Sequence, residues 1–342
     1  MEPVTYDLPM RVQFRGLERR RGMVWRGTAG WGEFSPFEEY AVAECRPWFR
    51  AAVEAAERGF PVAVRRFVPV NVTVPAVSAG TAERIVDESC GCMTAKVKVA
   101  ELGQGLDQDL ARVAAVRAVL GPAGRIRVDA NGAWAVDQAN DHLARLDQAA
   151  GGLEYAEQPC RTVQELAELR RLTKVPIAAD ESIRQAEDPL LVKRLAAADV
   201  IVLKVQPLGG VRACLELADQ VGLPVVVSSA VETVVGIAMG LALAGALPHL
   251  ELACGLATGQ LLAADLAKEA FPVVGGQIEL APAKVDLGLL AKAEAGMADQ
   301  MRWQDRLAAV AQSDTEASEV GSVGAGYSLE AGLAETSLEV EQ

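Results

Sequence analysis

The sequence alternates short apolar runs with stretches of helical character, and this alternation constrains the fold more than any other feature. Eight runs follow one another from Val68 onward, mostly 23 to 31 residues apart. The runs span 68–74, 95–99, 126–129, 153–157, 177–180, 200–204, 225–228 and 250–254, and the predicted helices between them span 107–120, 137–149, 162–172, 187–196, 210–221 and 231–247. This spacing is typical of a parallel strand followed by a helix, and eight such units close into a barrel. An open doubly wound sheet is the alternative.

Two regions lie outside the alternation. Residues 1 to about 40 predict strands and turns, and 37–59 predict a helix rich in Ala and Glu. From Gln312 to Gln342 the chain holds seven acidic residues, no Lys or Arg, and no apolar periodicity. Such a segment cannot bury enough apolar surface to offset the entropy of ordering, so we expect residues 312–342 to be a disordered acidic tail.

Composition excludes several classes of function. The 33 basic and 46 acidic residues give a net charge of −13, which disfavours binding to nucleic acid or to an anionic membrane. The longest apolar stretch, Val234 to Leu247, has fourteen residues and is too short to span a bilayer. The start lacks the pattern of a secretory signal, and the six scattered cysteines are typical of reduced thiols, so we expect a cytoplasmic protein. Nucleophile-elbow, phosphate-loop and dinucleotide-binding motifs are not found in the sequence.

Charged residues end five consecutive apolar runs. Lysines end the second and the sixth run, and carboxylates end the three runs between them; the residues are Lys96, Lys98, Asp129, Glu157, Asp180 and Lys204. The carboxyl ends of parallel strands meet at one mouth of a barrel, where active groups gather. Three carboxylates that converge there repel one another unless a divalent cation lies between them. Oxygen ligands favour Mg²⁺ over zinc.

The two lysines of the second run suggest a catalytic base. Lys96 and Lys98 alternate with Val97, so both side chains point to one face of the strand. Two close ammonium groups lower each other's pKa, and a lysine in this setting can act as a neutral base near pH 7. Together with a metal that holds a substrate carboxylate, this arrangement predicts removal of an α-proton and stabilisation of the resulting enediolate.

These motifs, in this order, resemble the enolase superfamily in its muconate-lactonising-like branch. The resemblance covers residues 1 to about 311 and rests on the segments 96–98, 129–131, 157–159 and 180–182 and on Lys204 with Gly209-Gly210 after it. It implies a (β/α)7β modified TIM barrel over 89–285 with an α+β capping domain formed by 1–88 and by a C-terminal segment, 286–311, that returns to the cap. It implies Mg²⁺, with Mn²⁺ able to substitute, bound by Asp129, Glu157 and Asp180, with Asn131 and Glu181 supporting these ligands.

Within this branch, the segments 30–37, 129–134, 157–160, 228–233 and 253–259 are most similar to actinobacterial enzymes of menaquinone biosynthesis. Their reaction is a Mg-dependent syn dehydration of 2-succinyl-6-hydroxy-2,4-cyclohexadiene-1-carboxylate to 2-succinylbenzoate, which would make the chain a lyase. The resemblance implies that Lys98 removes the α-proton and then helps hydroxide leave from the same face. It places Lys204 over the ring and makes Lys96 a modulator. It also implies that Ser228, Ser229 and Gly255 bind the succinyl carboxylate.

Other readings remain open. The eighth run ends Cys254-Gly255-Leu256 without an acidic residue, which disfavours dipeptide epimerases and muconate cycloisomerases. N-succinylamino acid racemases share the lysine pair and stay an alternative, alone or combined with the synthase activity. A catalytically silent metal-binding barrel is the alternative outside enzymes. In either enzyme case the expected partner is a small-molecule dicarboxylate, with no nucleic acid, no membrane and no obligate protein partner.

An arginine cluster near the N-terminus has two interpretations. Its members are Arg15, Arg19, Arg20, Arg21 and Arg26. They either form a lid that attracts a dianionic substrate or occupy a solvated turn. Local positive charge would help an acidic protein to bind a dianionic substrate. Seven of the acidic residues belong to the tail, so residues 1–311 carry 33 − 39 = −6.

Overall fold

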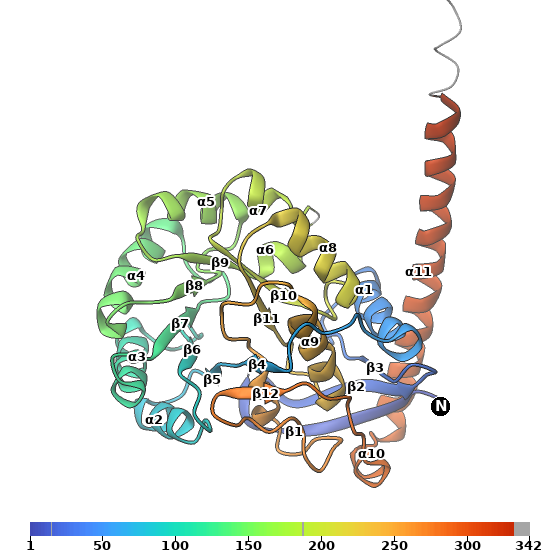
Figure 1. Ribbon diagram of the computed structural model, residues 1–342, viewed down its shortest axis with the longest axis horizontal. Helices are drawn as coiled ribbons and strands as arrows, with labels where there is room; N and C mark the ends of the chain where they lie inside the picture. Colours follow the sequence, from blue (N-terminus) through green and yellow to red (C-terminus); the bar gives the residue numbers. More distant parts are fainter. Residues whose placement is uncertain (15, 187, 332–342) are drawn as a thin grey trace, which may run out of the picture.

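A curled parallel sheet forms the centre of the molecule in a computed structural model that describes residues 1–14, 16–186 and 188–331 (Figure 1). Its seven strands lie in the order β11-β10-β9-β8-β7-β6-β5, so neighbours in sequence are neighbours in space. The strands are β5 (Val72–Val74), β6 (Thr94–Lys98), β7 (Arg125–Asp129), β8 (Tyr155–Glu157), β9 (Ile177–Ala179), β10 (Val200–Lys204) and β11 (Val225–Ser228). All of them pair in parallel, as the alternation predicted.

The eighth apolar run, residues 250–254, closes the seven-stranded sheet into a ring. Cys254 forms a parallel bridge with Val70, and Gly255 forms one with Ser228, so this segment lies between the two ends of the sheet. Inside the ring, the guanidinium of Arg127 donates to the carbonyl of Ala253 at 2.7 Å and so ties β7 to the closing segment. The closed arrangement excludes the open doubly wound sheet. The predicted strand 250–254 is reduced to these single bridges.

Helices surround the sheet on its outer side (Figure 1). They are α2 (Ala79–Asp87), α3 (Leu106–Leu120), α4 (Val136–Ala150), α5 (Val163–Leu172), α6 (Glu181–Arg184), α7 (Leu191–Arg194), α8 (Val211–Val221) and α9 (Val234–Ala246). Helix α2 is not among the predicted helices; it buries only Ala82 and Val86 along one face and so has a weak apolar signal. The predicted helix 187–196 is reduced to α7, and α9 starts at Val234 because the hydroxyl of Thr233 caps it by accepting from Val235 N.

An antiparallel sheet at the N-terminus forms the cap. It contains β1 (Val4–Phe14), β2 (Leu17–Arg26) and β3 (Trp31–Phe34), followed by α1 (Val42–Val53), which ends in a π-helical turn at Glu54–Arg58. The C-terminal segment returns to this sheet through α10 (Leu287–Ala293) and α11 (Met297–Ala331). Ala295 N donates to Thr5 O at 2.9 Å, and Trp303 of α11 packs edge-on against Phe34.

The boundary between cap and barrel differs from the expected residue 88. Strand β5 hydrogen-bonds to β6 in the barrel sheet and therefore belongs to the barrel, although it lies within residues 1–88. Just before it, β4 (Phe67–Pro69) pairs instead with β12 (Gln277–Glu279) in a small antiparallel sheet. The expected single strand 68–74 is thus two strands that belong to different sheets.

The C-terminal helix runs on into the segment that the sequence predicts to be a disordered tail. Helix α11 is assigned to Ala331 and projects from the body of the molecule (Figure 1), and the disorder of 312–342 stays a prediction. Local contacts support its course past residue 311: Arg50 of α1 pairs with Asp314 at 2.6 Å, and Gln312 donates to Glu316 one turn later at 3.0 Å. The remainder of the predicted tail, 332–342, lies outside the described residues.

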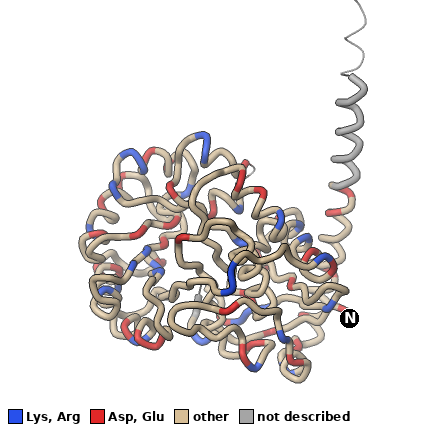
Figure 2. Tube along the Cα trace, viewed as in Figure 1, with Lys and Arg blue, Asp and Glu red and all other residues tan. Residues whose placement is uncertain are grey.

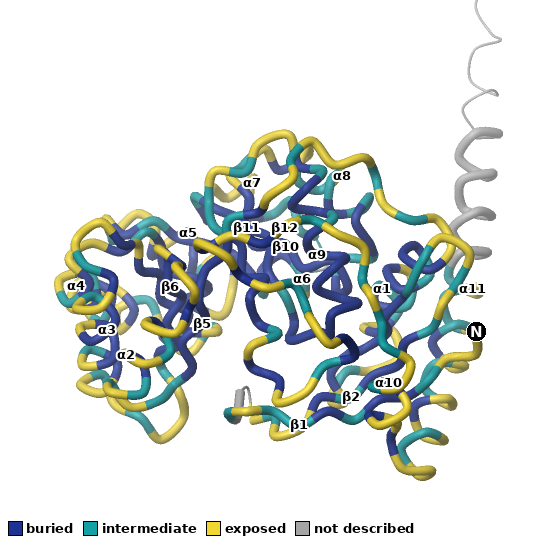
Figure 3. Tube along the Cα trace, turned by 60° about the horizontal axis from the view of Figure 1, so that its bottom comes forward, coloured by how far each residue is buried: buried dark blue, intermediate teal, exposed yellow. Residues whose placement is uncertain are grey.

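Burial follows the layers. The barrel strands and α9 are buried, whereas the outer helices expose one face (Figure 3). Lys and Arg alternate with Asp and Glu along the outer elements (Figure 2). Within the described residues, no helix combines the length and apolarity that a membrane span requires. All six cysteines are free thiols.

Candidate active site

Strand register brings the predicted charged residues to one mouth of the barrel. Lys98 of β6 is level with Asp129 of β7, and Asp129 is level with Glu157 of β8. On the other side, Lys204 of β10 is level with Ser228 of β11. Each of these residues is the last of its strand, so the parallel arrangement places them in one layer.

Two lysines contact the carboxylates of the first half of this layer. Lys96 Nζ lies 2.8 Å from Glu157 Oε1 and 3.1 Å from Asp129 Oδ2. Lys98 Nζ lies 2.6 Å from the same Asp129 oxygen and 2.6 Å from Asn131 Oδ1. Both ammonium groups therefore point to one face of β6, as the alternation with Val97 predicted. Asn131 reaches Lys98 from a left-handed turn, with φ +48°.

Asp180 has a separate set of partners. Its Oδ2 lies 2.5 Å from Lys204 Nζ, and its Oδ1 accepts from Arg184 Nε at 3.0 Å. Arg184 also pairs with Glu181 at 2.5 Å and donates to the Tyr40 hydroxyl of the cap at 3.0 Å. Asn131 Nδ2 approaches Glu181 Oε1 at 3.3 Å and so connects the two halves of the site. Sequence reasoning missed Arg184, although it follows Asp180 by one helical turn.

The pKa shifts separate the two lysines of β6. Burial lowers the pKa of Lys98 and outweighs the opposing effect of Asp129. Burial also acts to lower the pKa of Lys96, but Glu157 and Asp129 outweigh it, so the pKa of Lys96 lies well above its usual value. The expectation that the two lysines lower each other's pKa is therefore wrong for Lys96, because each of its contacts is a carboxylate.

The carboxylates also differ in pKa. Burial acts to raise the pKa of Asp129 and of Asp180, but their lysine partners reverse this and hold both values far below the usual range. For Glu157, burial and then the neighbouring Asp129 raise the pKa to about 7 despite Lys96. Glu157 Oε2 is buried and accepts no hydrogen bond from the described residues. Among the three carboxylates, Glu157 is therefore the one whose negative charge is least balanced by its neighbours.

The donor set suits a hard cation even though the carboxylates are not assembled around one point. Among the residues described, no three His, Cys, Asp or Glu side chains form a ready metal cluster, because lysine ammonium groups lie against Asp129, Glu157 and Asp180. The residues nevertheless fit a divalent cation. Carboxylate oxygens are the ligands that Mg²⁺ prefers, and Glu157 Oε2 is a buried oxygen that has no hydrogen-bond partner among the described residues.

A small cavity of about 30 Å³ lies at the centre of this layer. Its lining includes seven predicted residues: Lys96, Lys98, Asp129, Asn131, Lys204, Ser228 and Ser229. It also includes residues that sequence reasoning missed, namely Phe37, Thr73, Ala230, Val231 and Thr258. Glu157, Asp180, Glu181 and Gly255 are not among the residues that line it.

Part of the cavity lining carries hydroxyl groups, those of Ser228, Ser229 and Thr258. Ser229 Oγ lies 2.5 Å from Thr258 Oγ1. A Cβ on Gly255 would lie 2.6 Å from Ser228 Oγ, so glycine leaves room for that hydroxyl. Thr258 lies three residues beyond Gly255 in the same glycine-rich segment, which was the one signal in the sequence that could have indicated it.

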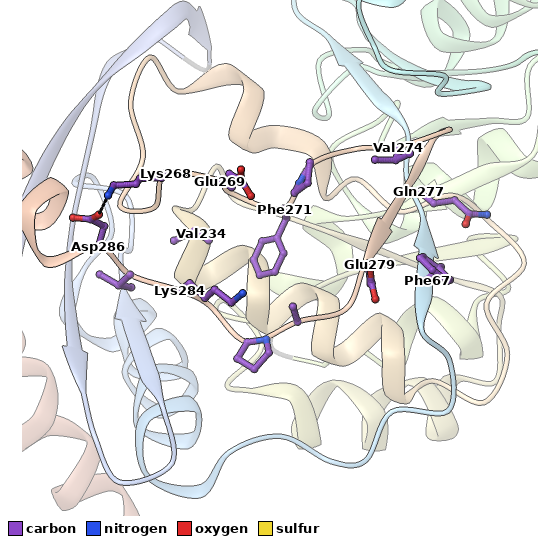
Figure 4. Close-up of a pocket in the computed structure, with 14 residues that line it drawn as sticks. Phe67, Val234, Lys268, Glu269, Phe271, Val274, Gln277, Glu279, Lys284 and Asp286 are labelled. Atoms are coloured by element: carbon purple, nitrogen blue, oxygen red, sulfur yellow. Dashed lines mark ion pairs between the residues drawn. The ribbon is translucent and has the colours of Figure 1, made fainter.

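A larger pocket of about 740 Å³ lies elsewhere, between the 268–286 segment and β4 (Figure 4). None of the predicted site residues line it. Two lysines line it, Lys268 and Lys284, and the largely exposed Lys268 pairs with Asp286 at 3.1 Å. The pocket therefore lacks the buried, mutually opposed charges that distinguish the barrel mouth.

Comparison with known families agrees with this geometry. A family model described as "Enolase C-terminal domain-like" matches residues 78–292, and one described as "Enolase N-terminal domain-like" matches residues 5–56. Among solved structures, the muconate lactonizing enzyme from Pseudomonas putida superposes with a TM-score of 0.72 at 21% identity, over 86% of this chain and 98% of that one. The N-succinyl Arg/Lys racemase from Bacillus cereus has the same TM-score at 18% identity, over 86% and 97% of the chains. At these identities the two structures show the fold alone.

The chain therefore belongs to the enolase superfamily. Sequence relatives define its place more narrowly. The o-succinylbenzoate synthase of Thermobifida fusca is 59% identical over 305 residues, covering 89% of this chain and 94% of the relative. That of Mycolicibacterium smegmatis is 52% identical over 302 residues, covering 88% and 92%. The chain is thus a close homologue of the actinobacterial o-succinylbenzoate synthases.

Proposed function

We propose that this chain catalyses the o-succinylbenzoate synthase reaction, the syn dehydration of 2-succinyl-6-hydroxy-2,4-cyclohexadiene-1-carboxylate to 2-succinylbenzoate, and that it is a hydro-lyase of menaquinone biosynthesis. The observation that carries the proposal is the high identity to two such synthases over nearly their full length. The buried lysines facing carboxylates at the barrel mouth supply the groups that this reaction needs.

Lys98 is the proposed acid and base. Its buried ammonium group has a lowered pKa, which favours the neutral form that can take the α-proton. Asn131 and Asp129 hold Nζ in place at 2.6 Å. The same Nζ then carries the proton that the leaving hydroxide needs, so abstraction and departure occur on one face of the ring. Lys204, on the opposite strand, would face the ring from the other side and contact the aromatic product through a cation–π interaction.

Mg²⁺, with Mn²⁺ able to substitute, is the proposed cofactor, and Asp129, Glu157 and Asp180 are its proposed ligands. This assignment is supported by Glu157 Oε2, which is buried and accepts no hydrogen bond within the described part of the chain. When bound, the cation would hold the substrate's ring carboxylate and stabilise the negative charge that develops there as the α-proton leaves. Asn131 and Glu181 would hold the surrounding residues in place through their contacts with Lys98 and Arg184.

Charge balance explains how an acidic protein can take a dianion. With all six groups ionised, the three carboxylates and the three lysines of the layer sum to 3 − 3 = 0, and with Lys98 as the neutral base they sum to 2 − 3 = −1. A bound divalent cation would make the layer positive in either state, which favours a substrate with two carboxylates. The succinyl carboxylate would then meet Ser228 and Ser229 at the part of the cavity lining that carries hydroxyl groups, where Gly255 leaves space.

The test is a dehydration assay run beside a racemisation assay. Purified protein with Mg²⁺ is given the cyclohexadiene substrate, and formation of the aromatic product is followed by absorbance. In parallel it is given an N-succinylamino acid, and loss of optical rotation is followed. We expect dehydration with a kcat/KM at least about tenfold above that for racemisation. Racemisation without dehydration would contradict the proposal and assign the chain to the racemases.

A further inference from the structure

Arg20 of β2 is buried although it belongs to a run of surface arginines. It is 2% exposed, whereas the side chains of its neighbours Arg19 and Arg21 are 44% and 25% exposed and pair with Asp7. Alternation along β2 turns Arg20 to the face of the cap sheet that covers the barrel. Neither interpretation of the arginine cluster, a lid or a solvated turn, describes this residue.

The guanidinium of Arg20 binds backbone from both sides of the interface between cap and barrel. Its Nε donates to Val231 O in the barrel at 2.9 Å. Its Nη2 donates to Ser35 O in the cap, and its Nη1 donates to Arg21 O at 3.0 Å. The flat face of the group stacks on the Phe37 ring, 4.9 Å from its centroid.

The barrel segment that Arg20 holds is strained. Val231 has φ +61°, a left-handed conformation that a β-branched side chain rarely adopts. Its neighbours are held as well: Ala230 N donates to Glu232 Oε2 at 2.6 Å, and Val231 N approaches Ser229 Oγ at 3.4 Å. Strain of this kind persists only where surrounding contacts impose it, and it concentrates at functional sites.

Two of the residues that Arg20 contacts also line the active-site cavity, Phe37 from the cap and Val231 from the barrel, with Ser229 and Ala230 beside the latter. We propose that Arg20 is a positioning residue for the reaction: it joins the cap wall to the barrel wall and fixes the 228–232 segment in the shape that presents Ser228 and Ser229 to the substrate. A bidentate, planar donor suits this task because it can bind two carbonyls and stack at once.

The first test measures the segment itself and does not depend on the proposed function. Backbone hydrogen exchange is compared between the wild type, Arg20→Met and the matched control Arg19→Met. We expect exchange in peptides covering 228–236 to be at least about tenfold faster in Arg20→Met and unchanged in Arg19→Met, while α4 keeps its protection in both. Unchanged exchange in 228–236, or an equal rise throughout the barrel, would overturn the proposal.

The second test concerns catalysis and rests on the proposed function. We expect Arg20→Met to lower kcat/KM for dehydration by about tenfold or more, mainly through KM, because the segment binds rather than reacts. Arg20→Lys should recover part of the loss, since one donor is restored. Val231→Gly should make Arg20 less important, because glycine adopts the left-handed conformation without strain.

The decisive comparison is Arg20→Met made in the Val231→Gly background. We expect its loss, measured against Val231→Gly alone, to fall below about threefold. A loss of the same size in both backgrounds would overturn the role in holding the strained segment. If the wild type does not dehydrate the substrate, the proposed function fails, and the hydrogen-exchange comparison still decides the role of Arg20.

Discussion

Lys98 and Lys96 occupy the same strand and share Asp129, yet their surroundings give them different properties. Lys96 contacts two carboxylates, which raise its pKa above the usual value. Lys98 contacts Asp129 and the neutral amide of Asn131, and burial outweighs the effect of Asp129, so the pKa of Lys98 is lowered. Lys98, which lies beside the uncharged amide of Asn131, is therefore the lysine that loses its proton more readily.

This difference leads to a mutational prediction. Lys98→Ala should reduce kcat for dehydration by at least about 10²–10⁴, the usual contribution of a general acid or base. The fold should be retained, because Asp129 keeps Lys96 as a partner at 3.1 Å. Circular dichroism and thermal unfolding check the fold, and Lys174→Ala at an exposed position is the control. Turnover within about threefold of the wild type would exclude Lys98 as the acid and base.

The residues that could be predicted from the sequence share one property. Asp129, Glu157 and Lys204 end buried parallel strands, so their spacing along the chain already places them in one layer. Arg20 could not be predicted in the same way. Its carbonyl partner on Val231 is 211 positions away, and only the packing of the cap on the barrel brings the two together. Contacts between the cap and the barrel leave no periodic pattern in the amino-acid sequence from which they could be predicted.

Helix α9 shows how closely an element can approach the site. Its first turn begins beside Glu232, and a Cβ on Gly236 would lie 2.4 Å from the Cβ of Glu232 and 2.6 Å from its Cγ. Glu33 of the cap accepts from Gly236 N at 2.8 Å and so holds the start of the helix against β3. The glycine therefore leaves room for the Glu232 side chain beside the first turn of α9.

A pair of glycine substitutions tests this packing. Gly236→Ala should lower the free energy of unfolding by about 1–3 kcal/mol through overpacking, as measured by chemical denaturation. Gly80→Ala, in α2, is the matched comparison because nothing lies within 4 Å of its added Cβ. It should leave stability unchanged or raise it by up to ~1 kcal/mol. Equal effects of the two substitutions would contradict the close approach at Gly236.

Glu232, in the segment before α9, makes stability depend on pH. Burial in the first place, and then Glu33, raise the pKa of Glu232 from 4.5 to about 7. The folded protein therefore keeps a proton that the unfolded chain releases at lower pH. Stability from this group is complete below about pH 4.5 and is lost as the pH rises through about 7.

The corresponding experiment compares the wild type with Glu232→Gln, which keeps an acceptor for Ala230 N. Glu157 and Asp265 also have raised pKa values and act in the same direction in both proteins. The difference in unfolding free energy between variant and wild type should therefore isolate Glu232. We expect it to shift in favour of the variant by ~1–3 kcal/mol between pH 5 and 8. Parallel stability curves would contradict a buried, proton-binding Glu232.

The elements that sequence patterns predicted are those with strong amphipathic or apolar runs. Strands β10 and β11 agree with the predicted ranges, and α3 and α4 agree within one residue at each end. Helix α2 was missed because its buried face is narrow. The course of α11 just past residue 311 was not predicted because composition alone argued for disorder, whereas Arg50 of α1 pairs with Asp314 there.

At the scale of the whole molecule, the acidic charge does not oppose an anionic substrate. Three of the acidic residues face three lysines at the barrel mouth, so the layer carries little net charge there and becomes positive once a divalent cation binds. The charge of −13 is carried elsewhere, with seven acidic residues in 312–342.

Binding of Mg²⁺ should raise the free energy of unfolding, which can be measured without an activity assay. Mg²⁺ at 100 times its Kd should raise the unfolding free energy by about 2.7 kcal/mol and increase Tm accordingly. Glu157→Gln should abolish this increase, because it removes the charge of the carboxylate whose second oxygen accepts no hydrogen bond from any residue that the structure describes. Glu168→Gln, at an exposed position on α5, is the control and should respond to Mg²⁺ like the wild type. An undiminished Mg²⁺ response in Glu157→Gln would remove this residue from the ligand set.

The most direct test of the account is dehydration of the cyclohexadiene substrate by protein stripped with EDTA and then titrated with Mg²⁺. We predict that the stripped protein forms no 2-succinylbenzoate above the uncatalysed rate. Activity should return in step with Mg²⁺ binding, and the Lys98→Ala variant should bind Mg²⁺ without regaining activity. Full dehydration activity in the stripped protein would contradict the proposed chemistry of this site.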